Sequence, residues 1–149
     1  MAVAGGGATG RIEGSITLQG RGSSVGAKAI LERGRLQGPC AKEGDFAIDD
    51  VPATSYVIEA VMPGYLTARR SVKVEANKTT PVPPVLLLGG DANNDGRVGI
   101  ADLAWIGAYF NTKPPGSSQA DINDDTIVDI YDLVLAGANF GRSQSPWPG

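Results

Sequence analysis

Histidine is absent from this 149-residue chain, and cysteine occurs once, at Cys40. The lack of histidine removes the commonest general base and the commonest transition-metal ligand. A single cysteine excludes an intramolecular disulfide and a cysteine-based zinc site. The sequence also contains no nucleophile elbow and no phosphate-binding loop, and its serines lie in turns without a base. These absences predict a protein that is not an enzyme.

Long apolar runs are missing as well. No run approaches the roughly 20 residues that a membrane-spanning helix needs, and lysine and arginine form no stripe of the kind that binds nucleic acid. The opening MAVAGGGATG lacks the basic and apolar regions of a signal peptide. We expect residues 1–9 to form a flexible, glycine-rich arm.

Charge is unevenly distributed along the chain. Residues 1–89 carry ten Lys and Arg against eight acidic residues, whereas residues 90–149 carry three against eight. All eight acidic residues of the second part are aspartate. Because glutamate is the better helix former, an all-aspartate set indicates loops or short ligand arms rather than helix surfaces.

Residues 10–88 show the pattern of a β-protein. Short apolar segments with a period near two, such as RIEGSITL and SYVIEAV, alternate with turn segments such as GRGSS and ANKTT. No helical pattern lies between them. The spacing predicts an antiparallel β-sandwich of the immunoglobulin or transthyretin-like kind.

The remaining part of the chain, 89–149, contains an internal duplication. GGDANNDGRVGIADLAWIGAYF at 89–110 aligns position by position with QADINDDTIVDIYDLVLAGANF at 119–140. Each copy places oxygen-bearing side chains at positions 1, 3, 5 and 12 of a twelve-residue loop, which is the ligand spacing of an EF-hand-type calcium loop. The side-chain ligands expected are Asp91, Asn93, Asp95 and Asp102 in the first loop, and Asp121, Asn123, Asp125 and Asp132 in the second.

Calcium takes six to eight hard oxygen ligands, so further groups are expected in each loop. The backbone carbonyls of Arg97 and Ile127 stand at position 7, and Asp129 stands at position 9 of the second loop. Gly96 supplies the sharp turn at position 6, where the second loop has Thr126 instead. The sequence therefore predicts two Ca²⁺ sites, with more strain in the second.

A short apolar helix is expected after each loop, because apolar residues follow the i, i+3, i+4, i+7 spacing. These residues are Leu103, Ile106, Gly107 and Phe110 in the first copy, and Leu133, Ala136, Gly137 and Phe140 in the second. Trp105 and Tyr109 lie off this stripe, and two interpretations of them stay open. They pack onto the rest of the protein, or they face a partner as binding hot spots.

Two family resemblances attach to these motifs. The stretch FAIDDVPATSYVIEAVMPGYL at 46–66 resembles the carboxypeptidase regulatory-like domains, a transthyretin-like sandwich family that is generally non-catalytic. The paired Asp-x-Asn-x-Asp loops with aspartate at position 12 look like a dockerin, a calcium-dependent docking module that binds cohesin domains. The resemblance covers residues 89–141 and implies a small all-α module after the sandwich, with domains at 10–88 and 89–149.

The dockerin resemblance also implies a partner surface. In that family the partner is contacted by loop positions 10 and 11 and by the following helix. The corresponding residues here are Ile100, Ala101, Ala108, Ile130, Tyr131 and Ala138, with Trp105 and Tyr109 as the open cases above. Trp147, in the tail, is a candidate for packing between the two termini.

These patterns together predict an extracellular or cell-surface calcium-binding protein. Its function would be calcium-dependent docking through the dockerin-like module to a cohesin-like domain. The alternative is a subunit of a self-assembling filament, tube or surface layer, in which the same surfaces contact sister subunits.

Overall fold

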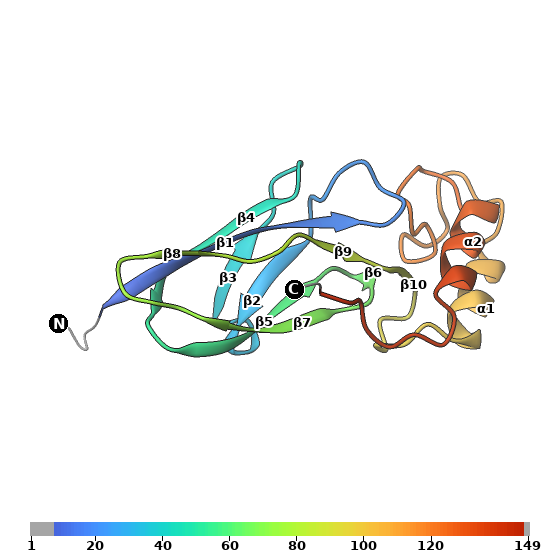
Figure 1. Ribbon diagram of the computed structural model, residues 1–149. Helices are drawn as coiled ribbons and strands as arrows, with labels where there is room; N and C mark the ends of the chain where they lie inside the picture. The colour runs from blue at the N-terminus through green and yellow to red at the C-terminus, as the bar shows by residue number, and fades with distance from the viewer. Residues whose placement is uncertain (1–7, 148–149) are drawn as a thin grey trace.

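The computed structural model describes residues 8–147, so most of the expected arm at 1–9 lies outside the described residues. Strands form the larger end of the molecule, and two short helices form the other end (Figure 1). The strands are β1 (Thr9–Leu18), β2 (Lys28–Leu31), β3 (Leu36–Pro39), β4 (Asp45–Pro52), β5 (Ser55–Val61), β6 (Gly64–Tyr65), β7 (Ala68–Lys73), β8 (Thr79–Pro81), β9 (Val85–Leu87) and β10 (Gly89–Asp91). The helices are α1 (Ile100–Ala108) and α2 (Ile130–Ala138), with a 3₁₀ turn at Glu32–Gly34.

The first sheet is built around β1. This strand pairs antiparallel with β4 on one side and parallel with both β8 and β9 on the other. The prediction of an antiparallel sandwich is therefore wrong for this sheet, which is mixed. After β7, which belongs to the second sheet described below, the chain crosses to the end of the first sheet where β1 begins. There the backbone N–H of Asn77 donates to Thr9 O at 2.8 Å. From that point β8 and β9 run alongside β1 in the same direction.

The second sheet has the order β3-β2-β5-β7 and is antiparallel throughout. Burial alternates along β5, where Tyr56, Ile58 and Ala60 are buried between exposed or half-buried neighbours. This period of two is what a strand with one face on the core requires. The two sheets share one hydrophobic core, and together they are called the sandwich below.

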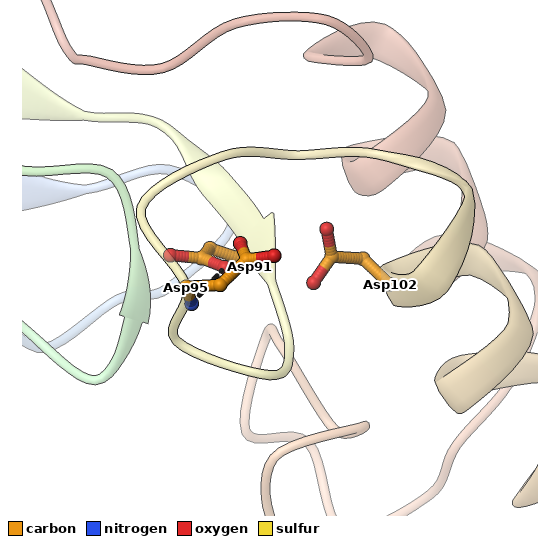
Figure 2. Close-up of side chains that lie close together, drawn as sticks. All are labelled: Asp91, Asp95 and Asp102. Atoms are coloured by element: carbon orange, nitrogen blue, oxygen red, sulfur yellow. Dashed lines mark hydrogen bonds between the residues drawn. The ribbon is translucent and has the colours of Figure 1, made fainter.

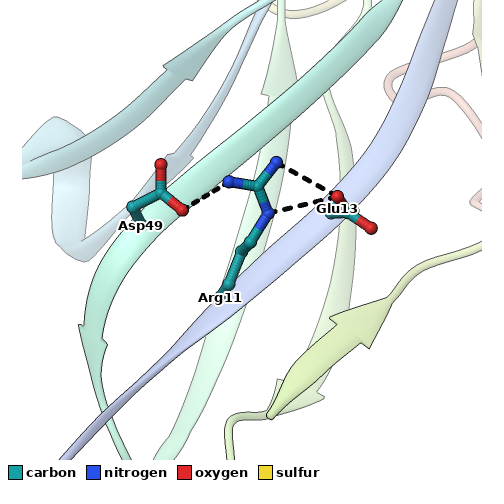
Figure 3. A network of polar contacts seen from close by, with 3 residues as sticks. All are labelled: Arg11, Glu13 and Asp49. Atoms are coloured by element: carbon teal, nitrogen blue, oxygen red, sulfur yellow. Dashed lines mark hydrogen bonds and ion pairs between the residues drawn. The ribbon is translucent and has the colours of Figure 1, made fainter. Parts of the chain in front are cut away.

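An ion-pair cluster lies on the outer face of β1 and β4 (Figure 3). Arg11 bonds to Glu13 on its own strand and to Asp49 on β4. The β1–β4 register shifts between Gly10 and Ile12, so Arg11 joins the two strands at the irregular point of their pairing. Because all three side chains are at least 41% exposed, the cluster contributes little to stability.

The helical end is not a separate module. β10, which leads into the first Asp-rich loop, pairs with β6 beside the sandwich. One hydrophobic cluster continues from Ile12 and Ile58 in the sandwich to Ile106 and Ala136 in the helices. The prediction of a sandwich followed by an all-α domain of its own is therefore wrong. The described chain is one mostly-β unit with two short helices at one end.

Both helices begin and end at equivalent positions. Asp102 in α1 and Asp132 in α2 lie in the first turn, and each carboxylate accepts a hydrogen bond from the backbone N–H of the residue before its helix. The helices end at Ala108 and Ala138, two residues before Phe110 and Phe140, which were expected to be the last residues of each apolar stripe. Phe110 and Phe140 consequently leave the stripe and are 37% and 52% exposed.

Candidate metal centres and their surroundings

The first loop brings three aspartates together. Carboxylate oxygens of Asp91, Asp95 and Asp102 lie within 4.8 Å of one another (Figure 2). Asp91 comes from the end of β10 and Asp102 from the first turn of α1, so a strand and a helix fix two sides of the group. Backbone N–H groups orient the carboxylates: Asp95 N and Gly96 N donate to Asp91 at 3.1 and 2.9 Å.

The second loop repeats most of this arrangement, although the bond that Asp95 N donates to Asn93 Oδ1 at 3.3 Å has no counterpart there. Asp121, Asp125 and Asp132 form the equivalent group, again within 4.8 Å. Asp125 N and Thr126 N donate to Asp121 at 3.3 and 3.0 Å. The duplication seen in the sequence is therefore a duplication of local structure.

Electrostatics make each group unfavourable without a cation. Asp91 and Asp102 are 3% and 1% exposed, and Asp121 and Asp132 are 3% and 0% exposed. Burial, together with the nearby Asp102 carboxylate, raises the pKa of Asp91 to about 6. Burial and the Asp132 carboxylate likewise raise the pKa of Asp121 to about 6. A bound divalent cation would offset both the burial and the repulsion.

The residues present fit a calcium ion. All the clustered donors are hard oxygens, which is the set that calcium prefers. Asn123, at position 3 of the second loop, has a buried Oδ1 atom with no hydrogen-bond partner among the described residues. A buried oxygen without a partner at a predicted ligand position is what a ligand atom lacking its ion would look like.

The other predicted ligands do not belong to the two groups of three aspartates. Asn93 lies beside Asp95, to which its Nδ2 donates at 3.3 Å. Asp129 lies outside the group of three, and its carboxylate accepts from Tyr131 N at 3.0 Å as the N-cap of α2. The carbonyls of Arg97 and Ile127 stay predictions.

Each loop is joined to the other copy by two backbone hydrogen bonds, and the two sets of bonds are equivalent. Gly141 N donates to Val98 O at 2.7 Å, and Val98 N donates to Arg142 O at 3.0 Å. At the equivalent positions of the other copy, Asn111 N donates to Val128 O at 2.7 Å, and Val128 N donates to Thr112 O at 3.1 Å. Each loop is thus tied to the segment that leaves the other loop's helix.

Most of the predicted partner residues lie on the surface. Ile100, Ile130 and Tyr131 are 72%, 55% and 65% exposed. Ala101, Ala108 and Ala138 are exposed too. Trp105 and Tyr109, in contrast, are half-buried against the core, and Trp105 Nε1 donates to Ser117 Oγ at 3.1 Å. These contacts agree with the packing interpretation, and a role of the two aromatic residues in partner binding stays a prediction.

Several residues at this end were not predicted. Asn94 Oδ1 accepts from Gly64 N, and Arg21 Nε donates to Ile122 O. In the sequence, Pro63-Gly64-Tyr65 is only a turn motif of the sandwich, and nothing local places it beside the loops. Trp147, predicted to pack between the two termini, contacts the sandwich, where its Nε1 donates to Pro83 O at 2.8 Å.

Comparison with known structures gives the fold. A chain of the crystal structure of an N-terminal interface mutant of the type II cohesin–X-dockerin complex from Acetivibrio cellulolyticus is similar over 90% of this chain and 97% of that one, at 22% identity and a TM-score of 0.76. The C-terminal interface mutant of the same complex matches over the same shares, at 20% identity and a TM-score of 0.73. No protein-family model matches the sequence, and no curated protein is recognisably similar to it.

These findings correct the family assignment made from the motifs. The solved structures match the chain as one unit, and both come from a type II cohesin complex. The identification of a carboxypeptidase regulatory-like sandwich followed by a separate dockerin-like module is wrong. The function inferred from that identification, docking to a cohesin-like domain through the dockerin-like module, is therefore wrong as well. The alternative of a self-assembling subunit was inferred from the same identification.

The EF-hand description is corrected on geometric grounds as well. An EF-hand has a helix on each side of its loop. Here the first loop follows strand β10, and the second follows a turn at 118–120. Neither helix within residues 8–147 is long and apolar enough to cross a membrane.

Proposed function

We propose that this chain is a non-catalytic, extracellular protein-binding module whose helical end is held by two calcium ions. The fold it shares with a chain of the type II cohesin complexes supports a protein partner. The sequence contains no histidine, the side chain that serves most often in general acid–base catalysis. Calcium modules that work outside the cell bind at the millimolar concentrations found there, which suits loops built from aspartate and asparagine.

The observation that carries the proposal is the composition of the exposed helix faces. The exposed positions of α1 are Ile100, Ala101, Ala104, Gly107 and Ala108, and those of α2 are Ile130, Tyr131, Val134, Gly137 and Ala138. None of these described positions carries a charge. Exposed apolar surface of this kind marks interaction sites in proteins that are otherwise polar outside.

Calcium contributes to this surface indirectly. Asp102 and Asp132 are ligand candidates and also lie in the first turns of α1 and α2. An ion held in each loop would fix the start of each helix and therefore the position of the exposed face. Because helices this short are marginal on their own, the metal would supply part of the free energy that forms them.

The partner that the comparison suggests is the other protein of a type II cohesin complex. We would immobilise the chain with calcium and offer it the cohesin and the X-dockerin of such a complex in separate experiments. Capture of one of them supports the proposal and shows which side of the complex this chain takes. Failure to capture either one, with the chain folded and calcium-loaded, contradicts this partner class.

A matched pair of variants tests the surface. Tyr131→Glu places a charge on the exposed face of α2 and is expected to weaken capture at least tenfold. Val57→Glu places the same charge on an exposed apolar position of β5, at the sandwich end, and is expected to leave capture unchanged. Equal losses in both variants would contradict the assignment of the surface to the helices.

A further inference from the structure

Both Asp-rich loops rest on the same two residues next to the sandwich. In the first loop, Asp91 is paired with Gly64 across the β10–β6 ladder, and Gly64 N donates to Asn94 Oδ1 at 2.6 Å. In the second loop, the Tyr65 hydroxyl lies 3.1 Å from Ile122 O, next to the ligand candidate Asp121. The dipeptide Gly64–Tyr65 that forms β6 therefore touches both loops.

The contact with the second loop is buried and specific. Tyr65 is 3% exposed and Ile122 is 1% exposed. Arg21 stacks over the Tyr65 ring, with its guanidinium carbon 5.3 Å from the ring centroid, and its Nε donates to Ile122 O at 2.8 Å. The Tyr65 hydroxyl also donates to Gln19 O at 2.7 Å, so its one proton is shared between Gln19 O and Ile122 O. The Ile122 carbonyl therefore accepts from Arg21 and lies within hydrogen-bond reach of Tyr65, and these contacts fix the backbone between the first and third ligand positions.

A second set of hydrogen bonds connects the two loops through β10. Asn139, just after α2, donates from Nδ2 to Gly89 O at 2.8 Å and to Gln19 Oε1 at 2.7 Å. Gln19 Oε1 also accepts from Gly89 N at 3.1 Å. The strand that supplies Asp91 to the first loop is therefore bound to the helix that supplies Asp132 to the second.

We propose that Tyr65 and Arg21 are positioning residues for the second loop, and that β6 couples the two loops so that filling one raises the calcium affinity of the other. This inference rests on the proposed calcium sites. The clustered carboxylates of a loop repel one another, so a loop without its ion is expected to be less well ordered than a filled one. An ion in one loop orders β10, β6 and α2, so the other loop is already ordered when its own ion arrives.

The first test follows each loop separately. Calcium chloride is titrated into the metal-stripped full chain, and the amide NMR signals of Gly96 and Thr126 report the first and second loops. Asp125 is an exposed ligand candidate, so Asp125→Asn weakens the second loop without altering a buried group. The expected result is that the first loop also loses calcium affinity, about fivefold or more. An unchanged first-loop affinity would overturn the coupling.

The second test addresses the positioning residues. Tyr65→Phe combined with Arg21→Gln removes both groups that contact Ile122 O, together with the Tyr65 bond to Gln19 O, and keeps the buried ring. We expect the second loop to lose about tenfold in affinity. Tyr56→Phe is the matched control, because the Tyr56 hydroxyl donates to Pro52 O within the sandwich, away from the loops. An equal loss in the control, or no loss in the double variant, would contradict the positioning role.

The outcomes separate this inference from the proposed function. If the wild-type chain takes up no calcium, the proposed metal sites fail and the coupling fails with them. If it takes up two ions that bind independently, the metal sites stand and only the coupling is overturned.

Discussion

Gly90 of β10 lies against Ala136 of α2 so closely that a Cβ on residue 90 would stand 2.5 Å from the Ala136 Cα. The backbone at Gly90 also has φ +116°, a conformation that other residues rarely adopt. The strand that begins the first loop can approach the second helix only because this position has no side chain.

Gly90→Ala is therefore expected to destabilise the calcium-loaded chain by about 3 kcal/mol, from backbone strain and the clash with α2. Urea unfolding measures the change. Gly137→Ala is the control, because nothing lies within 4 Å of a Cβ built there. In an exposed helical position that substitution should stabilise by about 0.5–1 kcal/mol. A loss at residue 90 no greater than the change at residue 137 would contradict the tight contact.

The carboxyl-terminal tail fastens the helical end to the sandwich through Ser145. This residue is 3% exposed, and its Oγ donates to Leu66 O at 2.7 Å and accepts from Leu88 N at 2.9 Å. Ser145→Ala removes one hydrogen-bond partner from the buried Leu66 carbonyl and one from the half-buried Leu88 N–H, so we expect a loss of about 1–3 kcal/mol in unfolding free energy. Ser143→Ala, at an exposed position of the same tail, should change it by less than about 0.5 kcal/mol.

Thr126 carries strain that its counterpart does not. It has φ +77°, whereas the equivalent residue of the first loop is Gly96 with φ +86°. Because a β-branched residue is disfavoured in this region, Thr126→Gly should relieve about 1 kcal/mol and tighten calcium binding in the second loop. The measurement is a calcium titration of the variant beside the wild type. Weaker binding in the second loop of Thr126→Gly would show that the strain is unimportant.

The clustering of aspartates in each loop could be predicted from local spacing. Asp91 and Asp95 meet because alternate side chains of one tight loop point to one centre, and Asp102 joins them from the first turn of the following helix. Asp121, Asp125 and Asp132 are arranged in the same way. Those interactions lie within single loops, so the sequence pattern contains them.

The arrangement of the two ends could not be predicted in the same way. β10 and β6 are paired although they lie far apart in the sequence, and each is too short to have a recognisable period. Their pairing joins the helical end to the sandwich and makes the prediction of a sandwich followed by an all-α module wrong. The parallel pairing of β1 with β8 and β9 likewise depends on a crossover between sheets that no local pattern records.

The pH dependence of stability should reverse when calcium is removed. In the metal-free chain, burial raises the pKa of Asp91 and Asp121 from 3.8 to about 6. Between these values the folded chain holds more protons than the unfolded chain, so its stability falls as the pH rises from about 4 to 6. With saturating calcium, deprotonation favours ion binding, and stability should rise over the same interval.

Urea unfolding at several pH values, with EDTA and with calcium, tests this reversal. A metal-free chain that gains stability as the pH rises through this interval would contradict the burial of the two carboxylates.

The most direct test of two calcium ions holding the helical end is native mass spectrometry of the calcium-loaded chain, with Asp102→Asn and Asp132→Asn beside it. We expect two ions on the wild type, and loss of an ion from each variant at a calcium concentration that just saturates the wild type. A wild-type chain that carries no calcium under these conditions, yet remains folded, would contradict the claim.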